Sequence, residues 1–258
     1  MSAHNARVHE LRALDTLSAG QTAIHRLHPL AKLICTMTIV ICTVSFGPYD
    51  FIRLVPYLFY PFIMMSIAEL PYRLLLSRVL IALPFCLFAG ISNVIFNRSI
   101  ALTIGSMNIS FGVLSLFTIL LKMYLCVMAA LLLVATTPFT ELTTQLRWMR
   151  IPYIFVMVFE MTYRYIAVLL EEAYSMTTAY RLRSGSKKAI EMRHMGSFVG
   201  QMLLRGFDRA ERVYTAMACR GYSLKHIPFA KRKMTGVDFA FLSAVFISCV
   251  LIRVINLR

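Results

Sequence analysis

Apolar residues in this chain gather in long runs separated by shorter polar stretches. Five runs, at 30–47, 51–68, 74–96, 113–135 and 238–255, come close to the roughly 20 residues with which an α-helix crosses hydrocarbon. The first and last runs are of marginal length, and Arg53 and two prolines interrupt the second. We therefore predict an all-α membrane protein with about five transmembrane helices.

A longer polar stretch separates the fourth run from the fifth. After the break at Pro152, residues 153–183 and 191–220 repeat apolar positions at a spacing of three to four, as amphipathic helices do. Each helix would be about 45 Å long. We expect an N-terminal lead (1–29), a region with four spans (30–136), a domain of three polar helices (137–236), and a fifth span with the C-terminus (237–258).

Basic residues concentrate on one side of these spans. The chain carries 27 Lys and Arg against 12 Asp and Glu, a net charge of +15, and sixteen of the basic residues fall within 136–236. The positive-inside rule therefore places that stretch and the N-terminal lead in the cytoplasm. The lead lacks an apolar run followed by a small-residue cleavage site, so we expect no cleaved signal peptide.

Composition narrows the classes of function. With 59% hydrophobic residues the chain is too apolar for an ordinary soluble domain, so its positive charge points to the membrane surface and to acidic protein partners rather than to nucleic acid. The six cysteines contain no CxxC pair, which indicates packing thiols and supports neither disulfides nor a zinc site. Without a P-loop motif, the chain cannot grip ATP in the way of a P-loop ATPase.

Three polar residues near or inside the spans are candidates for special contacts. Lys122 stands inside the fourth run, where an ionised side chain costs about 2.5–3.5 kcal/mol on insertion scales. We expect either an intramembrane contact or a side chain that extends to the interface. His25 and His28 have the i, i+3 spacing of a metal-binding pair without a third ligand nearby, which favours an interfacial or capping role.

Both long polar helices are predicted to end in an arginine followed closely by a glycine. Arg183 precedes Gly185, and Arg220 directly precedes Gly221. Glycine commonly follows the last turn of a helix, so each arginine becomes a charged fork at the end of a rigid rod, directed at an acidic acceptor. The alternative is that both arginines only neutralise helix C-termini. Within 191–220, Gly196 and Gly200 form a GxxxG pair, at which the two long helices are candidates to cross.

These motifs resemble the two Ala-Arg-Gly motifs of the T component of energy-coupling factor (ECF) transporters. The chain is most similar to the CbiQ subgroup, which serves cobalt uptake, and the resemblance also covers the lead from Leu14 to Leu33. Cys219-Arg220-Gly221 matches the second motif closely. Leu182-Arg183-Ser184 departs from the first, because its glycine comes one residue late, at Gly185.

The resemblance implies a multi-pass protein of the bacterial inner membrane with two long cytoplasmic coupling helices that cross as an X. In that family each motif docks in a groove of an ATP-binding cassette ATPase, and the T component transmits ATPase motion to a substrate-binding membrane (S) component. The implied coupling residues are Arg183, Gly185, Arg220 and Gly221. We expect no cofactor, metal or catalytic residue in this chain, and membrane lipid around its spans. The implied cargo is cobalt, with nickel or a vitamin as the alternative.

Two other classes of function remain open at this point. A membrane-bound enzyme would need a nucleophile and a base at the bilayer surface, and the candidates His194 and Glu191 have no Ser or Cys partner in a turn. A passive scaffold would bind partners, but its arginines would not affect ATP turnover. Co-purification with two ATPase subunits and a small membrane protein would distinguish a transporter subunit from an enzyme.

Overall fold

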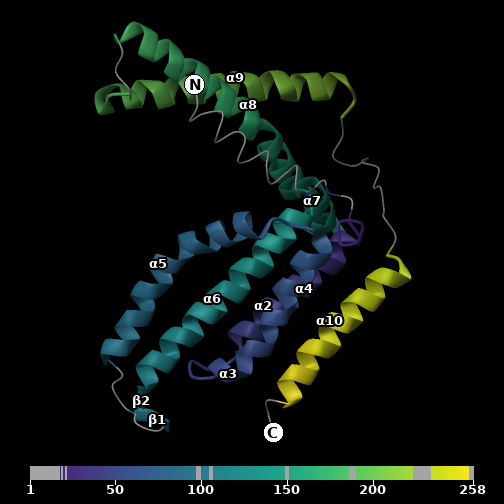
Figure 1. Ribbon diagram of the computed structural model, residues 1–258. Helices are drawn as coiled ribbons and strands as arrows, with labels where there is room; N and C mark the ends of the chain where they lie inside the picture. The colour runs from purple at the N-terminus through teal and green to yellow at the C-terminus, as the bar shows by residue number, and fades with distance from the viewer. Residues whose placement is uncertain are drawn as a thin grey trace. The chain divides into compact units, whose positions relative to one another are not determined.

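The computed structural model describes residues 18, 20, 22–96, 100–104, 107–148, 151–185, 190–222 and 234–255. Most of them are helical, as predicted (Figure 1). The chain divides into two compact units, one formed by residues 12–142 and 232–258 and the other by residues 1–11 and 143–231.

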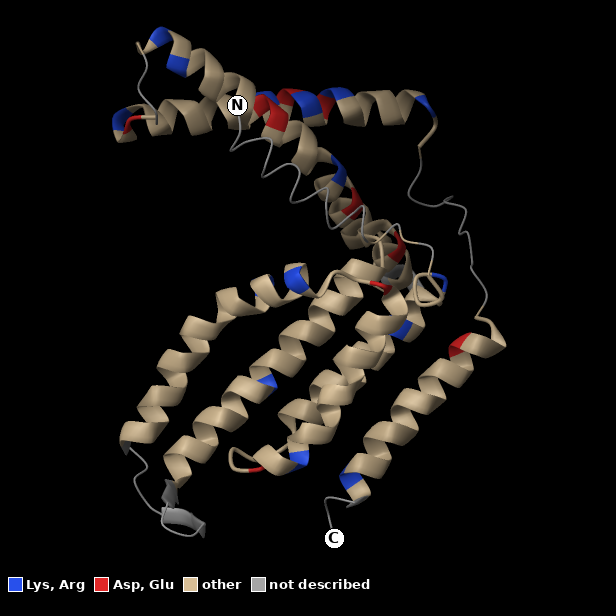
Figure 2. Ribbon diagram, viewed as in Figure 1, with Lys and Arg blue, Asp and Glu red and all other residues tan. Residues whose placement is uncertain are grey.

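The larger unit, 12–142 with 232–258, contains apolar helices with few charged residues along them (Figure 2). Two short antiparallel strands join α5 to α6 within the loop predicted between the third and fourth runs. The elements of this unit are α2 (Pro29–Val44), α3 (Phe51–Leu54), a 3-10 turn (Val55–Leu58), α4 (Phe59–Ala68), α5 (Tyr72–Phe96), β1 (Ile100–Ile104), β2 (Met107–Ser110), α6 (Phe111–Thr136) and α10 (Gly236–Ile255).

Five helical segments of the described residues are long and apolar enough to cross a membrane, which agrees with the predicted number. Their identity differs in one place. The first predicted span is the 16-residue helix α2, whereas Tyr153–Arg183, expected among the polar helices, passes the test of length and composition. The reason is that the first 18 residues of Tyr153–Arg183 contain only two charged residues, Glu160 and Arg164. The other four segments are Phe51–Ala68, Tyr72–Ile95, Phe111–Thr136 and Gly236–Val254.

Helices α2 and α6 pack together, and a lysine of each helix contacts a carbonyl oxygen at the C-terminal end of the other. Lys32, buried in the first turn of α2, donates from Nζ to the carbonyl oxygen of Thr136 at the end of α6 (2.7 Å). Lys122 of α6 donates from Nζ to the carbonyl oxygen of Phe46, just beyond α2 (2.5 Å). A positive charge is favourable beside the unpaired carbonyls of a helix C-terminus. Lys122 therefore contacts backbone carbonyl groups at the end of α2, beside the turn that follows this helix.

Asp238 joins the N-terminal lead to the start of α10. Its carboxylate accepts hydrogen bonds from the backbone N–H of His28 (2.8 Å) and from the N–H and hydroxyl groups of Thr235 (2.7 and 2.8 Å). His28 in turn caps α2, because its Nδ1 accepts a hydrogen bond from the N–H of Leu30 (3.2 Å). The predicted capping role is confirmed for His28, and the beginnings of α2 and α10 are fastened to each other.

The smaller unit, residues 1–11 and 143–231, contains two long helices, α8 (Tyr153–Arg183) and α9 (Met192–Cys219), together with most of α7 (Phe139–Trp148). With 31 and 28 residues, α8 and α9 are about 46 and 42 Å long. Val156 is the one buried residue of α8, and α9, which the structure describes throughout, has none. Figure 2 shows charged residues distributed along both helices. With the exception of Val156, the residues of both helices are thus half-buried or exposed within the chain itself.

Candidate functional site: two arginine-bearing helix ends

The end of α9 has the hydrogen-bond pattern of a Schellman motif. Arg220 caps the helix, and Gly221 after it adopts the left-handed conformation, with φ +72°. The N–H of Tyr222 donates to the carbonyl oxygen of Met217 (3.0 Å), and the N–H of Gly221 donates to that of Ala218 (3.0 Å), which are the two bonds of this motif. A residue with a side chain would be strained at this φ, so glycine is favoured. The predicted helix-terminating role of Gly221 is confirmed.

The end of α8 has the same backbone conformation. Ser184 caps the helix with φ −90° and ψ 10°, close to the φ −84° and ψ 9° of Arg220. Gly185 is left-handed, with φ +64°. The N–H of Ser184 donates to the carbonyl oxygen of Tyr180 (2.9 Å). Arg183 is therefore the last residue of the helix itself, one position before the cap.

The two arginines consequently leave their helices in different directions. Counted back from the left-handed glycine, Arg183 is the second residue and Arg220 is the first. One position corresponds to a rotation of about 100° around a helix axis. Ser184 is thus the structural counterpart of Arg220. Because Gly185 lies two residues after Arg183, whereas Gly221 directly follows Arg220, the two arginines point in different directions although the backbones of α8 and α9 end in the same conformation.

Both arginine side chains are exposed. Within the described part of the chain, neither guanidinium group forms an ion pair or a hydrogen bond. The last carbonyl groups of α9 already accept backbone hydrogen bonds from residues 220–222, so they do not need a guanidinium donor. Each arginine can therefore give its planar pair of donors to a carboxylate of another protein.

The two arginine-bearing ends lie at opposite ends of an antiparallel helix pair. Near the end of α8, Tyr180 Oη lies 3.1 Å from Nδ1 of His194, at the start of α9. Near the end of α9, Tyr222 Oη lies 2.5 Å from Oη of Tyr153, at the start of α8. Because α8 and α9 are joined at both ends, Arg183 and Arg220 are separated by about the length of α9, roughly 40 Å.

Gly196 and Gly200 do not mediate a close approach of the two helices. A Cβ built on either glycine meets no atom within 4 Å. The helices contact each other elsewhere, and between their ends Arg205 of α9 forms an ion pair with Glu172 of α8. The contact thus depends on long side chains that bridge the helices, and the structure does not show the predicted crossing at the two glycines.

No metal site is found among the described residues, in which no three His, Cys, Asp or Glu side chains lie close enough to share an ion. His25 Nδ1 lies 2.7 Å from the hydroxyl oxygen of Thr22. Glu191 and His194, the candidates for an enzymatic role, lie 3.8 Å apart at the start of α9. Both also contact the hydroxyl group of Tyr180, so they help to join α9 to α8.

Comparison with protein families identifies the family of this chain. The model of the CbiQ cobalt transport proteins matches residues 20–228, which is most of the chain. The chain belongs to the CbiQ family. Together with its apolar helices, this membership identifies a multi-pass membrane protein of a cobalt transport family.

Individual relatives of this CbiQ-family chain match it in part. A cobalt transport protein CbiQ of Rhodobacter capsulatus is 32% identical over 126 residues, 46% of this chain and 52% of that protein. An uncharacterized protein of Methanocaldococcus jannaschii is 25% identical over 197 residues, 71% of this chain and 67% of that protein. The nickel permease LarQ of Lactiplantibacillus plantarum is 26% identical over 116 residues, 45% of this chain and 42% of that protein. The matches thus span about half the length of the two relatives named as transporters.

Sequence reasoning missed residues whose partners lie far along the chain. Asp238 and Lys32 are examples, since their contacts reach back 210 residues and forward 104 residues. A charged residue at the edge of an apolar run is the signal that could have singled out both.

Proposed function

We propose that this protein is the transmembrane coupling (T) subunit of an ATP-driven ECF importer. The observation that supports this role best is the pair of exposed arginines at the C-terminal ends of α8 and α9. Arg183 stands two residues and Arg220 one residue before a left-handed glycine, and the two lie at opposite ends of the helix pair. A separation of roughly 40 Å is too large for one acceptor and suits two ATP-binding cassette ATPase subunits. Membership in the CbiQ family supports the same proposal.

In this proposal the α8–α9 pair carries a displacement from the ATPases to the membrane. ATP-driven closure moves the two ATPase grooves, and with them the helix ends that are docked there. An arginine–carboxylate pair is bidentate and permanently charged, so the joint keeps its geometry and does not depend on pH. The contacts between α8 and α9 make the two helices move together, and the motion reaches the substrate-binding membrane component beside them.

The role requires the N-terminus and the coupling domain, 137–236, to lie in the cytoplasm of a bacterial cell, below the inner membrane. The sixteen basic residues within 136–236 favour this orientation. Although α8 is apolar enough to cross a membrane, in this proposal it does not cross. Its partner α9 is amphipathic and charged, and the two helices contact each other at both ends, which is expected for helices on the same side of the bilayer.

The proposed cargo is the cobalt ion, with nickel as the alternative and a vitamin as a more distant one. The family model and the relative from Rhodobacter capsulatus favour cobalt, and the relative from Lactiplantibacillus plantarum favours nickel. In an ECF importer the S component holds the cargo, so the ligands of the ion are expected there. Uptake of Co²⁺ and Ni²⁺ by cells that express the complete transporter, each in competition with the other ion, distinguishes the two cargoes.

The experiment that tests the coupling role is co-purification of a tagged chain with its ATPases and S component. Arg183→Glu and Arg220→Glu should each weaken association with the ATPases by about tenfold or more, because a hydrogen-bonded charge pair contributes about 1.5–3 kcal/mol. Arg164→Glu is the matched control, since Arg164 is an exposed arginine of α8 away from both helix ends. Full recovery of the ATPases by both variants would rule out the proposed docking.

A further inference from the structure

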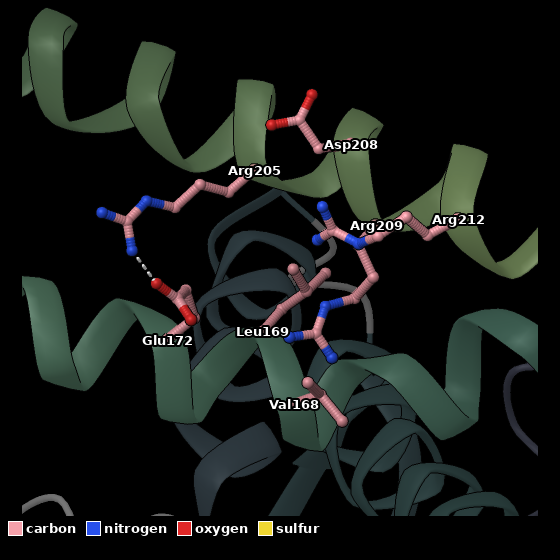
Figure 3. A pocket seen from close by; sticks show the side chains of 7 residues that line it. All are labelled: Val168, Leu169, Glu172, Arg205, Asp208, Arg209 and Arg212. Carbon is pink, nitrogen blue, oxygen red and sulfur yellow. Dashed lines mark hydrogen bonds and ion pairs between the residues drawn. The ribbon is translucent and has the colours of Figure 1, made fainter.

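A second group of arginines lies in a pocket at the middle of the α8–α9 pair (Figure 3). The pocket has a volume of about 220 Å³. Three arginines and an aspartate of α9 line it together with a glutamate and two aliphatic residues of α8. They are Arg205, Asp208, Arg209, Arg212, Glu172, Val168 and Leu169.

The charges in this arginine pocket are not balanced. Arg205 forms an ion pair with Glu172, and Figure 3 shows its side chain extended toward that carboxylate. Within the described part of the chain, Arg209 and Arg212 form no ion pair or hydrogen bond. Asp208 is the remaining carboxylate, and Figure 3 shows it turned away from Arg209. With three arginines against two carboxylates, the pocket keeps a net charge of +1, and two of its guanidinium groups have no ion-pair partner among the described residues.

Arg209 is the most informative of these residues. It is half-buried, and Figure 3 shows its side chain reaching from α9 toward Val168 and Leu169 of α8. A guanidinium group placed against aliphatic side chains loses part of its hydration, which is unfavourable unless an anion replaces the lost water. The position of Arg209 thus favours the binding of an anionic ligand.

An apolar cavity of about 400 Å³ adjoins the arginine pocket. Arg209 and Leu169 line both, so the two spaces meet at these residues. The apolar cavity lies along the first half of α8 and the second half of α9. Three of its twelve lining residues are methionines, Met157, Met161 and Met217. A cationic pocket beside an apolar cavity is complementary to a molecule with an anionic head and a hydrocarbon tail.

We propose that the two cavities together bind one anionic phospholipid. Its phosphate pairs with Arg209 and Arg212, since the guanidinium fork matches phosphate oxygens, and an acyl chain occupies the apolar cavity. A bilayer lipid is the favoured occupant because the first half of α8 is apolar enough for a membrane. α9 has the combination of an arginine-rich face and an exposed apolar face that helices at the membrane interface have. The proposal requires a membrane protein and does not depend on ATPase coupling.

Native mass spectrometry of the full chain in detergent tests the site, with phosphatidylglycerol and phosphatidylcholine as probes. The unaltered chain should bind phosphatidylglycerol in preference. The double variant Arg209→Gln/Arg212→Gln should bind it about tenfold more weakly or worse, because two charge-assisted contacts are lost. Arg164→Gln/Arg181→Gln removes the same charge from exposed positions outside both cavities and should bind like the unaltered chain. Arg209→Lys/Arg212→Lys keeps the charge and should retain more binding than the glutamine variant, while unchanged circular dichroism shows that every variant is folded.

The apolar half of the site has its own variant. Ala210 lines the apolar cavity and is exposed, so Ala210→Trp fills the cavity without removing a charge. It should weaken binding of phosphatidylglycerol as well. The proposal is overturned if either Ala210→Trp or the double glutamine variant binds phosphatidylglycerol normally. It is equally overturned if inorganic phosphate displaces the lipid at equal concentration, which indicates a free-phosphate site, or if the ATPases expel the lipid and protect Arg209, which indicates an acidic protein partner.

Discussion

The left-handed glycine after α9 offers a sharp test of how the second arginine is positioned. Gly221→Ala adds a Cβ to a residue with φ +72°. That Cβ meets no atom within 4 Å, so the cost is backbone strain and not a clash. A left-handed conformation costs an L-residue about 1–2 kcal/mol. We therefore expect the last turn of α9 to open about 5–30 times more often in the variant.

Hydrogen exchange of the full chain in detergent, read by mass spectrometry, measures this opening. The amides of Gly221 and Tyr222 are the reporters, because they make the two bonds of the Schellman motif. Gly200→Ala is the matched control, since it is the same substitution inside α9 and also meets open space. Removing a glycine from a helix interior stabilises it by about 0.5–1 kcal/mol, so exchange should slow. Equal protection of the α9 end in Gly221→Ala and the unaltered chain would refute the reasoning.

Three further predictions concern other parts of the chain. Lys32→Met should lower the melting temperature in detergent by several degrees, because the carbonyl oxygens of His25 and Thr136 lose a charged donor; an unchanged melting temperature would contradict this. Asp238→Ala should make Cys249 of α10, now 4% exposed, reactive toward maleimide, because the carboxylate that fastens α10 to the lead is lost; continued protection would show that this contact does not hold α10. Cys219, the one exposed cysteine of the six, should react with a membrane-impermeant maleimide in inside-out vesicles and stay unlabelled in right-side-out vesicles, and the reverse pattern would contradict the cytoplasmic orientation.

Much of the fold follows from the length of the apolar runs. The third, fourth and fifth runs became α5, α6 and α10 within a few residues of the predicted bounds, because hydrocarbon thickness fixes the length of such helices. The run at 30–47 became a helix of only 16 residues. Hydrophobicity did not separate α8 from the spans, since its first half is apolar and its charges lie mostly in the second half.

The helix ends could be predicted because their cause is local. Helices commonly end in a left-handed residue, and Gly185 and Gly221 adopt this conformation. The contact between α8 and α9 could not be predicted from Gly196 and Gly200, because small residues permit a close approach but do not attract a partner. The contact is made by charged and aromatic side chains distant in sequence, such as Glu172 with Arg205 and Tyr153 with Tyr222.

The central claim is that the ends of α8 and α9 each contact an ATPase subunit, and photo-cross-linking in the purified complex tests it most directly. Cys219, next to Arg220, is an exposed native thiol for a benzophenone maleimide, and Leu182→Cys in a Cys219→Ser background places the same probe next to Arg183. Leu182 is 81% exposed, so the substitution disturbs no packing. The account predicts adducts with an ATPase subunit from both positions. Adducts with the S component or lipid alone, and none with an ATPase from either position, would contradict it.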